Sequence, residues 1–504
     1  MKKLLSKIVS RLTVTLLLIA VQIGWGVAML LRASAVFPWI NGFFGVIAIF
    51  VVIYIINRNA NPSYKIAWIV PVLLFPLFGV SIYLLYGNKK PARAMRKKFK
   101  NNEYILRENL TQSEQTLADM SARDASRASY LIGRGYPVYE NTVTEYFPSG
   151  EALFPHIIEE ISKAERFIFL EYFIIEEGKV WGDILGILEQ KAKEGVDVRV
   201  IYDDVGCVGK LPAGYALKLQ AMGIKCREFN PFVPFVSVIM NNRNHRKILV
   251  VDGHTAFTGG INLADEYMNI THPFGYWKDT AVKLSGEAAW SFTCMFLQMW
   301  HVIRGKKEDI SAFLPDEKHR KSSGQGFVQP FSDSPLDDEP ISQNVYIDII
   351  SAAERYVYIC TPYLVIDNQM QDALILAAKR GVDVRIITPG IPDKKIIYRL
   401  TRSYYPELLR GGVRIYEYSP GFLHEKTIVS DDKCAVVGTI NMDFRSLYLH
   451  FECGVLMTNT TTVFDVRDDT LSVISSCREV TGPHKKRFLA RVFDSILRTF
   501  APLL

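Results

Sequence analysis

Long apolar runs are concentrated in the first 86 residues of this chain. Residues 12–31, 36–56 and 66–86 form three stretches of twenty or twenty-one residues without a charged side chain. A helix of that length can cross a hydrocarbon core of about 30 Å at about 1.5 Å per residue. The pattern predicts N-terminal membrane helices within a hydrophobic region spanning residues 1–88.

The first stretch has a competing interpretation, because basic residues precede it and Ala33-Ser34-Ala35 resembles a signal-peptide cleavage site. An uncleaved anchor fits better. The run exceeds the usual signal core of about 7–15 apolar residues, and two more apolar stretches follow it.

The flanking charges favour two crossings and a third stretch that returns to its own side of the membrane. This topology leaves Arg32 as the one positive charge outside, in line with the excess of positive charge on the cytoplasmic side. Pro71 and Pro76 can supply the bend. An outside start with three full crossings is the rival. Both place the remainder of the chain in the cytoplasm.

From residue 146 onward, short β-branched and aromatic runs alternate with helical patterns such as residues 184–193 and 370–379. Strand, helix and strand in this order predict an α/β fold with a largely parallel sheet. The tail, residues 482–504, places Phe488, Val492, Ile496 and Phe500 at fourfold spacing. It is predicted to form an amphipathic helix, which either lies on lipid or packs against the body.

The α/β part is duplicated. Three segments of the first half recur in the second half in the same order: 165–172 as 354–363, 195–201 as 381–387, and 223–229 as 412–418. The offsets are 354−165 = 189, 381−195 = 186 and 412−223 = 189. The sequence therefore predicts repeat 1 at 146–304 and repeat 2 at 341–481, packed as a pseudo-twofold unit. A basic juxtamembrane linker, 89–145, precedes them, and a polar linker, 305–340, joins them.

Each repeat carries the same short motif. His245, Lys247 and Asp252 are followed by Gly259 and Asn262, and in the second copy His424, Lys426 and Asp431 are followed by Gly438 and Asn441. Residues two apart on a strand share a face, so each imidazole lies beside an ammonium group. A histidine, a lysine and an asparagine amide together suit a phosphate group. One copy alone is commonly just surface charge, and the duplication argues against that interpretation.

Charge and cysteine content add modest constraints. The net charge is +7, with basic clusters at 89–100 and 485–487, which suits an anionic lipid surface as well as an ordinary solvated face. The seven cysteines form no Cys-x-x-Cys pair, which favours reduced thiols. No histidine spacing typical of a metal site is present, so neither a metal nor a cofactor is expected.

With two H-x-K-x4-D-x6-G-x-x-N motifs, the chain resembles the phospholipase D superfamily, and within it the bacterial cardiolipin synthases. Supporting features are residues 276–280, 361–363, 441–446, 450–452 and 502–504. Family members often carry Gly-Ser in the motif tail, where this chain has Gly259-Gly260 and Gly438-Thr439. The first copy therefore lacks a hydroxyl.

The resemblance implies a transferase that joins two phosphatidylglycerols and releases glycerol, through a phosphohistidine. His245 would be the nucleophile and His424 the general acid and then base, with Lys247 and Lys426 offsetting phosphoryl charge. The resemblance gives the other site residues supporting roles. Asn262 and Asn441 would contact the phosphate, and each histidine would be oriented by the carboxylate downstream of its own motif, Asp279 or Glu452. Asp252 and Asp431 complete the catalytic motifs in a structural or orienting role.

The implied partners are phosphatidylglycerol and anionic membrane lipids, without nucleic acid, at the bacterial inner membrane. The protein would be a multi-pass membrane protein with its catalytic repeats facing the cytoplasm. A hydrolytic phospholipase D or another phosphatidyltransferase is the alternative, and a nuclease is a third. The hydrophobic N-terminus argues against the nuclease. The oligomeric state stays open.

Overall fold

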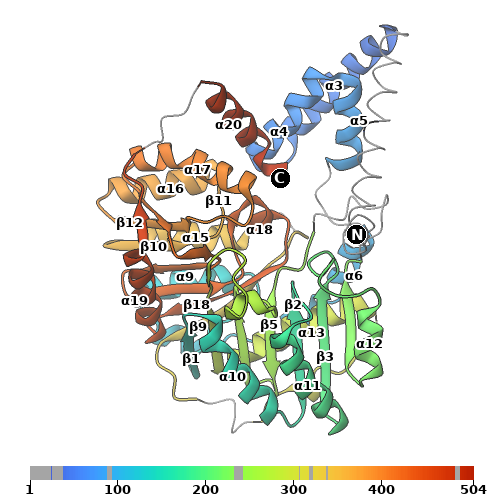
Figure 1. Ribbon diagram of the computed structural model, residues 1–504, viewed down its shortest axis with the longest axis vertical. Helices are drawn as coiled ribbons and strands as arrows, with labels where there is room; N and C mark the ends of the chain where they lie inside the picture. Colours follow the sequence, from blue (N-terminus) through green and yellow to red (C-terminus); the bar gives the residue numbers. More distant parts are fainter. Residues whose placement is uncertain are drawn as a thin grey trace, which may run out of the picture.

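Two β-sheets with flanking helices form the body of the protein, and a group of apolar helices projects from it (Figure 1). The computed structural model describes residues 38–87, 93–231, 242–305, 307–316, 322–336, 339–482 and 488–503, and Gly24. The first apolar stretch, residues 12–31, lies almost wholly outside the described residues.

The two sheets have the same topology, which confirms the tandem repeats. The first has the order β1 (Thr142–Phe147), β8 (Ala281–Gly286), β6 (Thr255–Gly259), β5 (Lys247–Val251), β2 (Phe167–Tyr172), β3 (Asp197–Asp203), β4 (Lys225–Phe229). The second has the order β9 (Phe327–Asp333), β18 (Glu452–Thr458), β16 (Cys434–Gly438), β15 (Thr427–Ser430), β10 (Tyr356–Cys360), β12 (Asp383–Pro389), β13 (Arg414–Tyr418), with β19 (Cys477–Glu479) added at the edge.

The sheets are mixed, so the prediction of a largely parallel sheet was wrong. In the first sheet only β2–β3 and β3–β4 are parallel, and β2–β5, β5–β6, β6–β8 and β1–β8 are antiparallel. The reason is a tight turn after β5, in which Asp252 and Gly253 take φ values of 51° and 79°. Such a turn returns the chain antiparallel to itself, whereas a parallel pair needs a long crossover.

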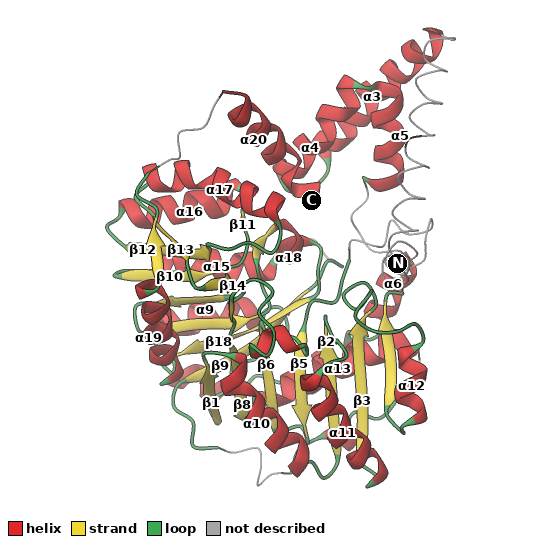
Figure 2. Cartoon of the chain, viewed as in Figure 1, coloured by secondary structure: helices red, strands yellow, loops and turns green. Residues whose placement is uncertain are grey.

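Helices cover both faces of the sheets (Figure 2). In repeat 1, α10 (Gly150–Lys163), α11 (Lys179–Lys193) and α12 (Tyr215–Ala221) pack on one face. Helix α13 (Ala289–Arg304) packs on the other and is buried nearly all round. The helices of repeat 2 are α15 (Ile341–Ala352), α16 (Asn368–Lys379), α17 (Lys395–Arg410), α18 (Phe444–Tyr448) and α19 (Thr462–Ser475). One hydrophobic core contains residues of both repeats, so the two form a single body.

The ranges predicted as linkers contain structure. Residues 305–340 include η3 (Ser311–Phe313) and β9, which is the edge strand of the second sheet. Residues 89–145 include four helices and most of β1; the helices are α6 (Arg93–Lys100), α7 (Tyr104–Asn109), α8 (Glu114–Asp119), α9 (Ala122–Ile132). Phe99, Ile105 and Leu131 from this range belong to the main core.

The N-terminal apolar region forms α3 (Pro38–Asn57), α4 (Pro62–Leu74) and α5 (Pro76–Tyr86). The third predicted stretch is split at Phe75, where α5 folds back on α4 so closely that a Cβ on Gly79 would lie 2.2 Å from the Pro71 carbonyl oxygen. Helix α4 has 13 residues, which is about 20 Å at 1.5 Å per residue. Among the residues that the structure describes, no helix has both the length and the apolar content needed to cross a bilayer.

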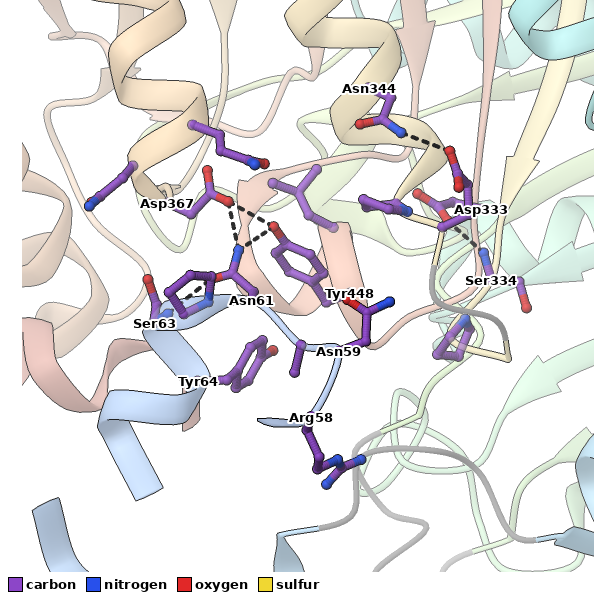
Figure 3. Close-up of a pocket in the computed structure, with 18 residues that line it drawn as sticks. Arg58, Asn59, Asn61, Ser63, Tyr64, Asp333, Ser334, Asn344, Asp367 and Tyr448 are labelled. Carbon is purple, nitrogen blue, oxygen red and sulfur yellow. Dashed lines mark hydrogen bonds between the residues drawn. The ribbon is translucent and has the colours of Figure 1, made fainter. Parts of the chain in front are cut away.

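The loop between α3 and α4 attaches this helical group to repeat 2. The side-chain amide of Asn61 donates to Asp367 Oδ2 at 2.6 Å and to the Tyr448 hydroxyl at 2.7 Å (Figure 3). The Tyr64 ring packs edge-on against Phe444 at 5.5 Å. At the other end of the chain, α20 (Phe488–Phe500) and η4 (Ala501–Leu503) also contact α4.

Candidate active site

The two motif histidines precede equivalent central strands, and each is fixed by the main chain of the other repeat. The His245 N–H donates to the Phe451 carbonyl at 2.9 Å, and the His424 N–H donates to the Lys278 carbonyl at 2.7 Å. Strand β7 (Tyr276–Lys278) pairs in parallel with β14 (Gly421–Leu423), which leads into His424. Phe451 and Lys278 each directly precede a carboxylate, Glu452 and Asp279.

Those carboxylates hold the histidines across the repeats. Both oxygens of Glu452 lie 2.9 Å from His245 Nδ1, and Asp279 Oδ2 lies 2.6 Å from His424 Nδ1. Each carboxylate had been expected to serve the histidine of its own motif, and this pairing was wrong. The reason is that strands from opposite sheets meet at the site, so the carboxylate after each motif faces the other repeat.

The protonation of the site follows from this geometry. Burial lowers the pKa of both imidazoles well below the usual value. Burial disfavours ionised carboxylates, but contacts with the site cations and imidazoles outweigh it and hold the pKa of Glu452 and Asp279 below their usual values. An ionised carboxylate only accepts, so each Nδ1 carries the hydrogen. Nε2 is then the atom of each ring that is left to react, as a base in the neutral ring and as an acid when it also carries a proton.

Lys247 and Lys426 lie fully buried beside the histidines. Lys247 Nζ donates to the His245 carbonyl at 2.8 Å, and Lys426 Nζ donates to the His424 carbonyl. Burial lowers the pKa of Lys247 to about 7 and that of Lys426 to about 8. Desolvated ammonium groups of this kind are well placed to bind a phosphate anion, which would restore their charge.

Asp252 and Asp431 lie at the far ends of their motif strands. The Asp252 carboxylate accepts the N–H groups of residues 165, 166 and 167 at 2.8–2.9 Å, and the Asp431 carboxylate accepts those of residues 354, 355 and 356 at 2.8–3.0 Å. Asp252 lies seven positions after His245 along extended chain, a distance of about 20 Å. The two aspartates therefore stabilise the turns at the start of β2 and β10. They lie too far from the histidines to take part in the chemistry there.

The two asparagines line the cleft with different partners. Asn262 Oδ1 accepts the Ile174 N–H at 3.0 Å, and its amide donates to the Tyr267 hydroxyl at 2.7 Å. Asn441 is also buried, and its Oδ1 has no hydrogen-bond partner among the described residues. Asn441 is thus the freer of the two to contact a ligand.

The motif tails differ in how they hold the carboxylates. The Thr439 hydroxyl donates to Glu452 Oε2 and accepts the Cys453 N–H at 3.0 Å. In the first copy, a Cβ on Gly260 would lie 1.9 Å from Asp279 Oδ1. Asp279 Oδ1 instead accepts a hydrogen bond from the Thr280 N–H at 2.9 Å. The hydroxyl missing from the first copy would have occupied the space that the Asp279 carboxylate fills.

His450 is a site residue that the motif analysis did not assign. Its ring lies 5.7 Å from that of His245, its Nδ1 lies 3.7 Å from Glu452 Oε1, and neither ring nitrogen has a hydrogen-bond partner in the described part of the chain. Only its spacing, two residues before Glu452, could have suggested it. Among described residues, His245, His450 and Glu452 form the one group with metal-ligand geometry, their ligand atoms lying within 4.8 Å of one another.

Both motif histidines open into one cleft of about 960 Å³ between the repeats. Aromatic and apolar side chains form much of its lining, and the charged residues around it include Glu176, Lys210, Asp393, Lys394 and Arg445. A separate cavity of about 550 Å³, at the junction of Asn61, Asp367 and Tyr448, contains neither motif histidine (Figure 3). The cleft that contains both motif histidines is therefore the candidate reaction site.

Two tandem α/β repeats that bring two motif histidines into one cleft, each with a buried lysine two residues further on, define an enzyme of the phospholipase D superfamily. Residues 157–300 and 346–471 match the family described as "Cardiolipin synthase, PLD-like domain", and residues 46–88 match "Phospholipase_D-nuclease N-terminal". The chain belongs to the cardiolipin synthase family of this superfamily.

Full-length relatives agree with this placement. An uncharacterized protein of Streptococcus mutans is 46% identical, covering 90% of this chain and 99% of its own length. Cardiolipin synthases of Geobacillus sp. and Halalkalibacterium halodurans are 37% and 33% identical over 90% and 98% of this chain, and over 92% and 100% of their own. The crystal structure of phosphatidylserine synthase from Haemophilus influenzae, 17% identical, has the same fold, with a TM-score of 0.55 over 75% of this chain and 97% of that one.

Proposed function

We propose that this protein is a cardiolipin synthase that transfers a phosphatidyl group from one phosphatidylglycerol to another and releases glycerol. The observation that carries the proposal is the pairing of two buried imidazoles in one cleft, each held by a carboxylate of the opposite repeat. Two such groups suit a double displacement, in which one attacks phosphorus while the other moves the proton.

In the first step, His245 Nε2 attacks the phosphorus of the donor lipid. The bond from phosphorus to the glycerol oxygen breaks, and this oxygen takes the proton that His424 carries on Nε2, because the bound phosphate anion and Asp279 stabilise the doubly protonated ring. Glycerol leaves, and the phosphatidyl group remains on His245 as a phosphohistidine. Lys247 and Lys426 offset the charge on the phosphoryl oxygens, with Asn441 and Asn262 nearby.

In the second step, His424 removes the proton from a headgroup hydroxyl of the acceptor phosphatidylglycerol. The acceptor oxygen bonds to phosphorus, the phosphorus–nitrogen bond breaks, and His245 Nε2 is free again. Glu452 keeps His245 in one tautomer throughout and stabilises its positive charge in the adduct. Asp279 does the same for His424 when it carries the additional proton.

The proposal extends to the membrane. The apolar helices α3–α5 would hold the enzyme at the inner membrane, with α4 and α5 as a hairpin that enters and leaves on the cytoplasmic side. The support is the break at Phe75 and the contact of Asn61 with repeat 2, since a loop bound to the catalytic body lies on the same side as that body. Exposed apolar side chains on all three helices suit lipid contact.

A hydrolytic phospholipase D is the second candidate, because water can replace the acceptor hydroxyl. The size of the cleft, about 960 Å³, favours transfer, since it has room for groups beyond a water molecule. A nuclease would not need the exposed apolar helices.

The test is to incubate the purified protein with phosphatidylglycerol vesicles and identify the lipids. We expect cardiolipin and glycerol in equal amounts. Phosphatidic acid and glycerol without cardiolipin would establish the hydrolase instead. If the vesicles gave no lipid product and the protein cleaved added nucleic acid, it would be a nuclease.

A further inference from the structure

Helix α20 turns its apolar side away from the protein. Its large exposed side chains are Phe488, Leu489, Val492, Phe493 and Ile496, with exposed fractions of 40% to 78%. With 3.6 residues per turn, these five lie within an arc of about 140°. An apolar stripe of this width on a helix of a soluble body normally faces the core.

The opposite side of α20 is polar and is bound to the catalytic body. Asp494 is buried and accepts from Arg399 Nε of α17 at 2.6 Å, and Arg498 donates to Glu407 of α17 at 2.9 Å. Leu497, on the same side, packs against the main core. Turning the apolar stripe inward would break both ion pairs, so the helix is held with its apolar side outward.

The chain then runs from α20 into the catalytic cleft. Ala501, the first residue of η4, is buried and lines the same cleft as the motif histidines. Leu503 packs against both the main core and the apolar cluster of α3–α5. The last residues therefore join three parts: the exposed helix, the N-terminal helices and the reaction site. Figure 1 shows α20 beside α4, with the C-terminus at their junction.

We propose that the apolar side of α20 binds the surface of an anionic lipid bilayer, and that η4 thereby holds the wall of the cleft at a fixed position relative to that surface. The inference rests on the proposed function in one respect, that the substrates reach the cleft from a bilayer.

Continuity and charge identify the bilayer as the occupant. Helix α4, which contacts α20, exposes Ile66, Leu73 and Leu74, so the apolar surface continues from one helix to the next. The sequence Lys485-Lys486-Arg487 directly precedes α20. An apolar face flanked by basic residues is typical of helices that lie in the headgroup region of anionic membranes.

The direct test uses an environment-sensitive fluorophore on a single cysteine, in a cysteine-free full-length protein reconstituted into vesicles of phosphatidylcholine and phosphatidic acid. Leu489→Cys is compared with Leu217→Cys on α12, because the two leucines are similarly exposed, at 78% and 70%. Nitroxide-labelled acyl chains should quench the label at 489 and leave the label at 217 unchanged. Two outcomes would overturn the proposal. In one, aqueous iodide quenches the label at 489 and the nitroxides do not; in the other, neither quencher reaches the label because protein covers it.

A second test measures the effect on turnover. In the double variant Leu489→Ser/Ile496→Ser, the ratio of cardiolipin formation from bilayer phosphatidylglycerol to that from a monomeric short-chain phosphatidylglycerol should fall at least about tenfold, since two buried leucine-sized contacts with lipid are lost. The control Leu217→Ser should keep the wild-type ratio. Equal losses on both substrates would mean that α20 supports the fold alone.

The two proposals fail separately. If the wild-type protein made phosphatidic acid and no cardiolipin, the quenching result would be unaffected, and the ratio would be measured on that product.

Discussion

At the scale of single residues, the site consists of two histidine–lysine pairs with unequal surroundings. His245 has Glu452, Thr439 and His450 around it, whereas His424 has Asp279 and lies among the rings of Tyr267, Trp277 and Phe422 at 5.4–5.7 Å. The repeated motif had given no means of distinguishing the two histidines.

Replacing either histidine tests the double displacement. His245→Ala and His424→Ala should each abolish turnover without loss of folding, and Lys247→Ala or Lys426→Ala should cost roughly 10²–10³-fold in kcat, as for a preorganised charge stabiliser. Rapid quenching with labelled donor and mapping of the acid-labile adduct assigns the nucleophile. An adduct on the peptide that contains His424 would reverse the proposed roles.

The lysines should set the alkaline limit of activity. Since only the protonated amine attracts phosphate, and burial lowers the pKa of Lys247 to about 7 and of Lys426 to about 8, kcat/KM should fall as the pH rises through this range. Bound substrate restores the charge, so the limit in kcat should lie at higher pH. Rate profiles in mixed micelles measure both, and coincident limits would show that the lysines are fully charged in the free enzyme.

Gly260 should be essential because the absence of a side chain leaves room for the Asp279 carboxylate. Gly260→Ala would place a Cβ on the Asp279 carboxylate, displace it from His424 and lower kcat roughly a hundredfold. Gly186→Ala on α11, where a Cβ would meet nothing within 4 Å, is the matched control. Full activity of Gly260→Ala would show that Asp279 can shift without loss of the His424 contact.

At the scale of elements, the aspartates of the motifs belong to the turns rather than to the chemistry. Asp252→Ala removes three hydrogen bonds to backbone N–H groups, which at about 1 kcal/mol each lowers the free energy of unfolding by about 3 kcal/mol. We expect a lower Tm by calorimetry and nearly unchanged kcat per folded molecule. A large loss of kcat at unchanged Tm would return Asp252 to the catalytic set.

Sequence patterns predicted the motif strands and the α/β class from local periodicity, and the repeats from segments that recur 186 to 189 residues apart. Strand direction was not predictable from the same signal, since it depends on the turn at Asp252 and Gly253. Strand β9 was missed because residues 305–340 are rich in Lys, Ser, Gly, Asp and Pro and were predicted to be a linker. The structure places β9 at the edge of the sheet, where its Pro330 is tolerated. The crossed carboxylates depend on how the two sheets face each other, which no pattern along one chain reports.

At the scale of the whole molecule, the repeats are interdependent. A chain cut between residues 316 and 322 should give two pieces that are inactive alone, because each holds a histidine without its carboxylate. Co-expression should restore cardiolipin formation, measured in membranes of a strain without other synthases. Activity from either piece by itself would contradict the crossed arrangement.

Metal removal should leave the enzyme active. Two lysines beside the motif histidines already supply positive charge, and a metal between His245, His450 and Glu452 would have to displace the hydrogen bond that orients His245. Dialysis against a strong chelator should preserve the rate, and added Zn²⁺ should inhibit it. Lost activity that one particular metal restores would make that group a true metal centre.

The pairing of each motif histidine with a carboxylate of the other repeat also bears on how the protein is made. Ribosomes synthesise the chain from its N-terminus, and Glu452 follows His245 by 207 residues. The first repeat therefore leaves the ribosome while its proposed nucleophile still lacks the group that orients it. We therefore expect a half-made chain to be latent, and lipid chemistry to start only after Glu452 has left the ribosome and reached His245.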